Sequence, residues 1–255
     1  MKSLIIYTLF LISSISAEIT NYERGLLLYE KRANNAVGLK ANTAFIDKAI
    51  NEFLKGFKTA DSELNAGIYL LRCYYYKGKF IAEDDQEKKE FFNQGKALGE
   101  KLIELYPKSA GAYYWYLVNL GSWAEVYGIL SAAKEGVANT MREYSNKIID
   151  IDSSYSDGGG YFMLGAVHLK SPYIPFILSW PSDEMALDYL SLAYETGDST
   201  PSQTVYLARA LYTNDKKEKA ISLLSSLLDE KISESYKLED LEQHDIAKKQ
   251  LEDWK

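Results

Sequence analysis

The chain has 255 residues, with 29 Lys and Arg against 36 Asp and Glu, and a formal net charge of −7 at pH 7. This acidity and the lack of a long basic run argue against nucleic acid or an anionic membrane as the partner. The single Cys73 cannot form an intramolecular disulfide, and in its apolar setting it is expected to be a small core residue.

The first 17 residues have the order of a secretory signal peptide. Lys2 precedes the apolar run Leu4–Ile12, and small residues follow as far as Ala17. A buried N-terminal helix is the alternative. No later stretch reaches the roughly 18 apolar residues of a membrane span, and no Cys stands at the processing site to carry a lipid. The sequence therefore predicts an exported, soluble protein with a single domain at residues 18–255.

Amphipathic helices are expected along this whole domain. In Phe45–Phe57 the apolar residues recur at i, i+3, i+4 and i+7, which is the apolar stripe of a helix. The same stripe occurs in Phe91–Leu105, Val137–Ile151, Met185–Tyr194 and Ala220–Leu228. No segment alternates polar and apolar residues, and turn-forming stretches such as "YPKSAG" and "TGDSTP" separate the helices. The fold is predicted to be all-α.

A second set of helices shares a tyrosine followed by Leu or Phe. These pairs begin at Tyr69, Tyr116, Tyr161 and Tyr206, and each follows one amphipathic helix. The spacing between these four tyrosines is nearly constant, and such a period indicates stacked helix-turn-helix repeats. HEAT-type repeats fit the spacing, but "LIELYPKSAGAYY" and "KKEKAISLL" favour tetratricopeptide-like repeats around a central cavity or groove. The charged C-terminal segment is expected to form a capping helix.

One face of each second helix mixes aromatic with hydrogen-bonding side chains, at offsets of zero, three and seven from the tyrosine. Such a mixture suits the wall of a ligand cavity, although a packed core with hydroxyls at the surface is the alternative. The helix "AYYWYLVNLGSWAEVYG" is apolar on every side except at Glu125, as expected for a cavity wall. The predicted lining residues are Tyr69, Arg72, Tyr76, Tyr116, Asn119, Trp123, Tyr161, His168, Tyr206 and Arg209.

The sequence contains no pattern that predicts catalysis. His168 and His244 lie far apart without a metal-binding companion, and no HExxH, Walker-type or G-x-S-x-G motif occurs. The acidic run Glu83–Glu87 lacks the spacing of a calcium loop. We therefore expect no enzyme activity, no cofactor and no bound metal.

The connection Ser171–Ser182, "SPYIPFILSWPS", is strongly apolar for a loop. It is expected either to fold over the cavity mouth or to contact a subunit or partner.

Three motifs occur in order along the chain: N-L-G-x-W at Asn119–Trp123, the Gly-rich helix entry Gly158–Tyr161, and the Pro-containing loop at Pro172 before "DEMALDYL". Together they resemble the T-component (TatT family) of tetratricopeptide-associated TRAP transporters. The similarity runs from Ser62 to Glu230. Two features depart from the family: no lipoprotein Cys is present, and "GGG" replaces the more usual Gly-Gly-Pro.

This resemblance implies a periplasmic accessory protein that binds or channels a small organic acid or apolar solute. It also implies docking to the solute-binding protein of a TRAP transporter, and a homo-oligomer, often a trimer. The alternative is a tetratricopeptide scaffold for protein–protein interaction without a small-molecule cavity.

Overall fold

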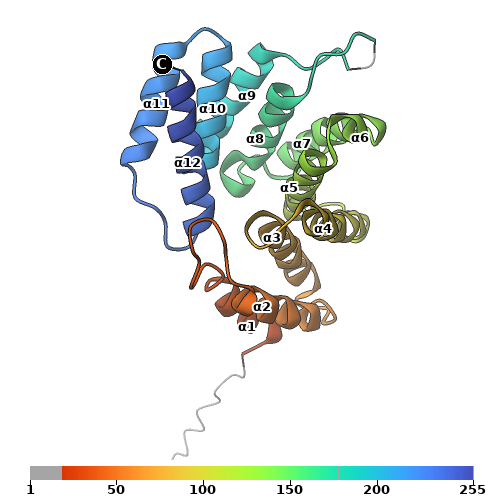
Figure 1. The fold of residues 1–255 in the computed structure, drawn as a ribbon. Helices are drawn as coiled ribbons and strands as arrows, with labels where there is room; N and C mark the ends of the chain where they lie inside the picture. The colour runs from red at the N-terminus through yellow and green to blue at the C-terminus, as the bar shows by residue number, and fades with distance from the viewer. Residues whose placement is uncertain (1–18, 177, 255) are drawn as a thin grey trace, which may run out of the picture.

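The computed structural model describes residues 19–176 and 178–254, so the predicted signal peptide lies outside the described residues. Within them the chain is helical, with two isolated β-bridges and no strand, which confirms the all-α prediction (Figure 1). The helices are α1 (Asn21–Tyr29), α2 (Thr43–Gly56), α3 (Glu63–Phe80), α4 (Asp85–Leu105), α5 (Ala110–Tyr127), α6 (Ile129–Lys134), α7 (Val137–Asp152), α8 (Tyr155–Lys170), α9 (Asp183–Thr196), α10 (Pro201–Thr213), α11 (Lys217–Asp229) and α12 (Lys237–Asp253).

The predicted helix-turn-helix repeats are present. Four of the five predicted amphipathic helices (α2, α4, α7, α9) are the first members of pairs, and the tyrosine helices that follow them (α3, α5, α8, α10) are the second members; the fifth, α11, is followed by α12. The tyrosine helices also contact one another in order, α3 to α5, α5 to α8, and α8 to α10, and α10 then contacts α12. They therefore form one continuous row along the curve of the molecule.

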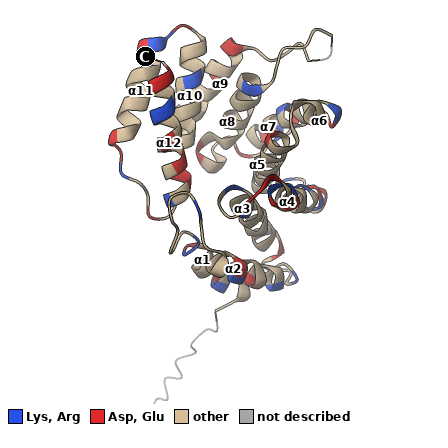
Figure 2. Ribbon diagram, in the orientation of Figure 1, with Lys and Arg blue, Asp and Glu red and all other residues tan. Residues whose placement is uncertain are grey.

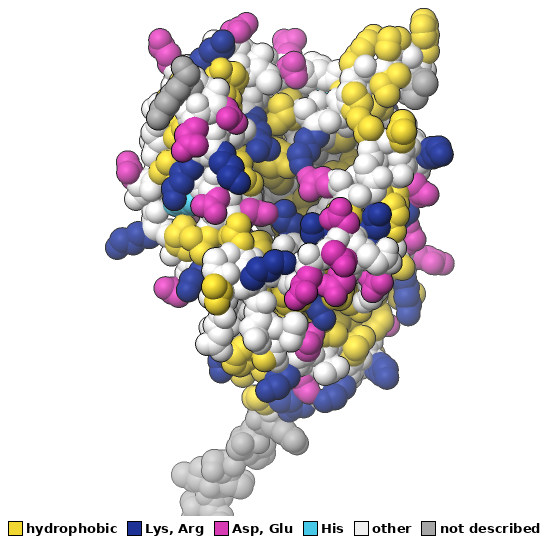
Figure 3. Space-filling model, in the orientation of Figure 1, with side chains coloured by type: hydrophobic (Ala, Val, Ile, Leu, Met, Phe, Trp, Pro, Cys, Tyr) yellow, Lys and Arg dark blue, Asp and Glu magenta, His cyan; other side chains and the backbone are white. Residues whose placement is uncertain are grey.

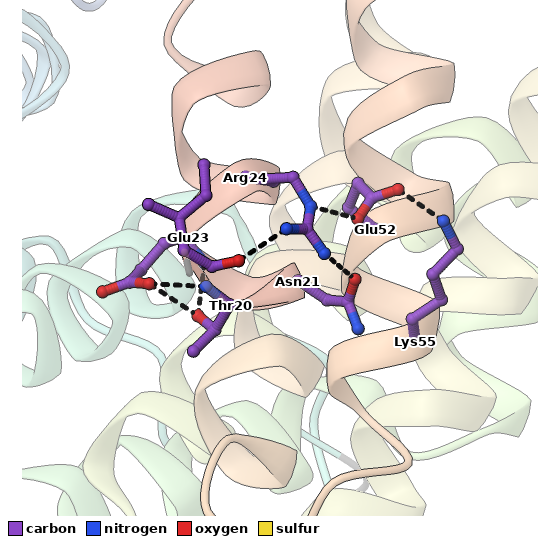
Figure 4. Close-up of polar contacts among 7 residues, drawn as sticks. Thr20, Asn21, Glu23, Arg24, Glu52 and Lys55 are labelled. Carbon is purple, nitrogen blue, oxygen red and sulfur yellow. Dashed lines mark hydrogen bonds and ion pairs between the residues drawn. The ribbon is translucent and has the colours of Figure 1, made fainter. Parts of the chain in front are cut away.

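Helix α1 begins at a capping box and is joined to α2 by charged side chains (Figure 4). The hydroxyl oxygen of Thr20 accepts a hydrogen bond from the Glu23 N–H at 3.1 Å, and the Glu23 carboxylate accepts one from the Thr20 N–H at 2.7 Å. Arg24 Nε lies 3.1 Å from the Glu52 carboxylate, which also accepts from Lys55 Nζ at 2.5 Å. This contact ties α1 to α2.

The curved row closes on itself, because α12 returns to the N-terminal helices (Figure 1). Leu238 is buried in the same apolar cluster as Tyr29 and Phe80. Two ion pairs flank this contact: Arg32 donates to Glu239 at 2.8 Å, and Lys79 Nζ lies 2.8 Å from Glu242. The predicted capping helix therefore also joins the two ends of the repeat array.

The apolar connection between α8 and α9 projects from the body of the molecule (Figure 1). We call residues 171–182 the finger. Its root packs on α7 and α8 through Trp180, while Tyr173 and Phe176 are exposed. It does not fold over the hollow of the ring, so of the two expectations only a contact with another molecule is left.

Candidate binding groove on the concave face

The inner surface of the row is hollowed between the C-terminal helices and the helices α3 to α5 (Figure 3). In the view of Figure 2, Lys and Arg are interspersed with Asp and Glu along the helices. The chemistry of the hollow therefore depends on which charged groups lack a partner there.

Arg72 of α3 lies among aromatic rings. Its guanidinium carbon is 4.6 Å from the ring centroid of Tyr69, 4.8 Å from that of Trp115 and 5.2 Å from that of Tyr29. Cations are attracted to the faces of such rings, which holds the side chain in place. Its Nε is buried and has no hydrogen-bond acceptor among the described residues, and no described carboxylate pairs with it. We call these four residues the Arg72 cluster.

A groove of about 310 Å³ lies farther along the row, between α8, α10 and α12. Tyr212 and Trp254 stack with their centroids 4.2 Å apart and form one wall. Arg209 makes no ion pair with a described residue, and the Gln250 Oε1 is buried without a donor among the described residues. We call this the Arg209 groove; it is lined by Leu169, Lys170, Arg209, Tyr212, Thr213, Gln250 and Trp254.

The acidic groups near the hollow, by contrast, have cationic partners. Glu239 pairs with Arg32 and Glu242 with Lys79, as described above, and Glu125 accepts a hydrogen bond from Lys170. Burial, and then the charges of Glu242 and Glu239, raise the pKa of Tyr75 well above its usual value. Arg72 and Arg209, by contrast, have no carboxylate partner among the described residues, so the face that holds them is suited to an anionic group.

The ten residues predicted to line a cavity are divided by the structure. Tyr69 and Arg72 belong to the Arg72 cluster, and Tyr206 lies beside Arg209, with 5.5 Å between ring centroid and guanidinium carbon. Tyr161 is half-buried on α8 and belongs to neither group. The five others are at most 8% exposed and pack between helices: Tyr76, Tyr116, Asn119, Trp123 and His168.

Polar atoms of the buried residues are mostly used in helix packing. The Asn119 amide donates to the Leu71 and Trp115 carbonyls at 3.1 and 2.9 Å, and the Trp123 indole donates to Asn93 at 2.8 Å. Such groups hold helices together and do not face the hollow. A role in lining the concave face therefore stays a proposal for Tyr69, Arg72, Tyr206 and Arg209.

Several residues of the concave face were missed by the sequence analysis. Trp115 directly precedes the aligned Tyr116, so alignment on the tyrosine selected the side of α5 that packs on its neighbours. Tyr29 lies in α1, which has no counterpart in the repeats, and Trp254 lies in the helix predicted only as a cap. The aromatic character of these positions was visible, but their contacts join different helices and could not be read from one helix at a time.

His168 is expected to make stability depend on pH. Burial, and then the charge of Arg142, lower its pKa, and its Nδ1 accepts a hydrogen bond from the Ser182 N–H at 3.2 Å. The unfolded chain therefore binds a proton at His168 more readily than the folded chain does. The stability that neutral His168 contributes is complete above a pH of about 6.5 and is lost as the pH falls below it. We expect a loss of about 1 kcal/mol between pH 7 and pH 5 that is absent in His168→Gln, measured by urea unfolding. If the free energy of unfolding depended on pH equally in both proteins, this prediction would be wrong.

A second groove of about 310 Å³ lies on the outside of α1 and α2. Its Arg24, Glu52 and Lys55 pair with one another (Figure 4), so they are less available to a ligand than Arg72 and Arg209.

In the part of the chain that the structure describes, no three His, Cys, Asp or Glu side chains are grouped to hold a metal. None of the described helices combines the length and the apolar character needed to cross a membrane.

Comparison with known proteins gives a family and a fold. The family model "RMD1-3: Regulator of microtubule dynamics protein 1-3" matches residues 27–170, more than half of the chain. Regulator of microtubule dynamics protein 3 of Rattus norvegicus is 31% identical over 85 residues, which are 33% of this chain and 17% of that protein. A thermophilic TPR protein of Thermus thermophilus superposes with a TM-score of 0.57 at 14% identity, over 92% of this chain and 96% of the other. The TPR-like fold is thereby confirmed.

The match to RMD1-3 corrects the resemblance to the TatT family. Two of the three motifs lie on helices of the repeat array, where they serve packing: Asn119 and Trp123 join α5 to its neighbours, and Gly158–Gly160 lie close to neighbouring side chains. The TRAP transporter role, its solute-binding partner and the periplasmic setting taken from that resemblance are therefore wrong. Export itself was inferred from residues 1–17, which the structure does not describe, and it stays a prediction.

Proposed function

Because the chain belongs to the RMD1-3 family, regulator of microtubule dynamics protein 1-3, we propose that it is a helical-repeat scaffold that binds another protein on its concave face. Stacked helical repeats generally form extended concave binding surfaces. This is the scaffold function weighed as the alternative from the sequence, and it needs no catalytic group.

The observation that carries the proposal is the pair of arginines without described carboxylate partners on the concave face. A half-buried guanidinium is stabilised when it meets a carboxylate, and Arg can bind one through two parallel hydrogen bonds. Arg72 and Arg209 each have aromatic neighbours that provide apolar contact area beside the charge. A segment of a partner protein with acidic and apolar side chains would satisfy both features.

The name of the rat relative places that protein in the regulation of microtubule dynamics. The aligned region is 17% of its length, so the proposal for this chain is limited to the binding step. Within such regulation the chain would act by holding a partner, without transforming it. Self-association remains a further proposal from the sequence.

Site-specific crosslinking tests the scaffold proposal. A photoreactive residue at Thr213, exposed beside Arg209, should crosslink a partner protein, whereas the same residue at the exposed Leu105 on α4 should not. Replacing Arg72 and Arg209 with Gln should weaken binding of the purified partner by about tenfold or more per arginine, since hydrogen bonds to charged groups contribute about 1.5–3 kcal/mol.

A charge-matched control removes two exposed lysines, Lys58→Gln with Lys108→Gln, and should bind as the unchanged protein does. Equal crosslinking from Leu105, or equal weakening by the control pair, would show that the concave face is not the binding surface.

A further inference from the structure

The finger holds apolar side chains away from the body of the protein. Phe176 at its tip is fully exposed and Tyr173 is 63% exposed. Two backbone hydrogen bonds join its arms, Ile174 N–H to Leu178 O and Leu178 N–H to Ile174 O, both at 2.8 Å. The finger is therefore a hairpin held by backbone hydrogen bonds, and not an irregular loop.

The tip also has an unfavourable backbone conformation. Phe176 has φ +65°, in the left-handed region that bulky residues rarely adopt. Such conformations persist where the surrounding structure enforces them, and they concentrate at functional positions. Here the strained residue also exposes its ring to water, so the folded chain gains no packing from it.

The root of the finger is fixed by Trp180. Its indole N–H donates to Asn139 of α7 at 3.0 Å, and its ring meets His168 edge-on with centroids 4.9 Å apart. The guanidinium carbon of Arg142 lies 4.4 Å from the same ring. These contacts hold the finger on α7 and α8 in one direction.

A second exposed apolar point lies at the same end of α7. Ile129 and Leu130, the first residues of α6, are 59% and 78% exposed. Helix α6 contacts α7 and leads into it through Gly136, and Asn139 under the finger root is in the first turn of α7. Figure 3 shows apolar surface over this upper right part of the molecule.

We propose that this edge of the protein docks on the surface of an electrically neutral phospholipid bilayer, with Phe176 and Tyr173 inserted. Along the finger, the apolar Phe176 comes first, then the amphipathic Tyr173, then Trp180 with the cation Arg142 at the root. This order matches the hydrocarbon, the interface and the phosphate level of a bilayer.

Charge decides between the candidate surfaces. Residues 171–182 carry no charge, Asp183 and Glu184 follow at the root, and the whole chain has a net charge of −7, so an anionic membrane would not attract it. A second copy of the chain is disfavoured, because both grooves described above contain charged side chains, Lys48 and Glu52 in one and Lys170 and Arg209 in the other, which suit an uncharged tip less well than lipid does. The neutral bilayer surface fits the uncharged tip.

Vesicle flotation tests the proposal with the full chain. The protein should float with phosphatidylcholine vesicles, with little change when phosphatidylserine or salt is added. Phe176→Asp should reduce the bound fraction by about tenfold or more, as expected for losing the burial of one Phe side chain. Leu54→Asp on α2, which replaces a partly exposed Leu outside this edge, is the matched control and should float normally.

Fluorescence reports insertion directly. Tyr173→Cys labelled with a polarity-sensitive dye should shift to shorter wavelength with vesicles, whereas Leu54→Cys should not; Cys73 is buried and should not take the label. Because Phe176 is fully exposed, Phe176→Asp should melt like the unchanged protein. Absence of flotation, flotation unaffected by Phe176→Asp, or binding only to phosphatidylserine vesicles would overturn the proposal. A wavelength shift of the dye with a protein partner, and none with vesicles, would also overturn it.

Discussion

Replacing Arg32 with Met is expected to lower the free energy of unfolding by about 3 kcal/mol and to release α12 from the N-terminal helices. Arg32 is 3% exposed, and it donates to the Glu239 carboxylate at 2.8 Å and to the Ser235 carbonyl at 2.6 Å. Its guanidinium carbon also lies 4.3 Å from the Tyr29 ring centroid. Removing one partner of a buried pair leaves the other charge without compensation, which is why the expected loss is large.

Urea unfolding measures the loss, and hydrogen exchange at residues 237–243 measures the release. Lys88→Met is the matched control, because Lys88 and Asp85 form an exposed pair at 3.0 Å whose loss should change stability by less than about 1 kcal/mol. Adding Glu239→Gln to Arg32→Met should recover part of the stability by removing the unpaired charge. If exchange in α12 stays as slow as in the unchanged protein, the ring does not depend on Arg32.

Closure by α12 also determines what the concave face can bind. Burial, and then the charges of Glu242 and Glu239, raise the pKa of Tyr75, which lies on the same helix as Arg72, and without Arg32 and Lys79 both carboxylates would lack a cationic partner. The Arg32–Glu239 and Lys79–Glu242 ion pairs therefore have two effects: they hold the two ends of the array together, and they occupy the two carboxylates, so that Arg72 and Arg209 stay available to an anionic partner. A partner that needs Arg72 should accordingly bind less well to an opened ring.

The repeats could be predicted from the sequence because each depends on local pattern. Phe45–Phe57 and its counterparts follow helical spacing, and the tyrosines mark the second helix of each pair, as α2 to α10 show. Helix α1 has a capping box at Thr20 and Glu23 that could have been found in the same way.

The site could be predicted only in part, because its residues meet through contacts distant in sequence. Arg32 and Glu239 are 207 positions apart, and neither lies in a motif. Helix α5 is apolar on nearly every side. Its spacing therefore could not show that Trp115 lies beside Arg72 while the neighbouring Tyr116 is buried in the core. The apolar loop around Phe176 left two expectations open, a cover over the cavity mouth or a contact with a partner, because its sequence does not show that the two arms pair through Ile174 and Leu178 and project from the body (Figure 1).

Replacing Gly95 with Ala is expected to lower the free energy of unfolding by about 3 kcal/mol. A Cβ at this position of α4 would lie 2.0 Å from the Asn119 Oδ1, so the amide of Asn119 must move. That amide donates to the Leu71 carbonyl of α3 at 3.1 Å, and its displacement would leave a buried acceptor unpaired. Overpacking of a core costs about 1–3 kcal/mol and an unpaired buried group about 1–3 kcal/mol, which together give the estimate.

Gly121→Ala, on α5 two residues after Asn119, is the matched control. Its Cβ would meet only Met141, with the nearest atom at 3.8 Å, so the better helix propensity of Ala should raise stability by about 0.5–1 kcal/mol. The double variant Gly95→Ala with Asn119→Ala separates the two causes, since without the amide only the Cβ of residue 119, at 3.0 Å, still lies close to the new methyl group. Its destabilisation should be smaller than the sum of the two single losses in urea unfolding. Strict additivity would show that Gly95 acts through some other contact than Asn119.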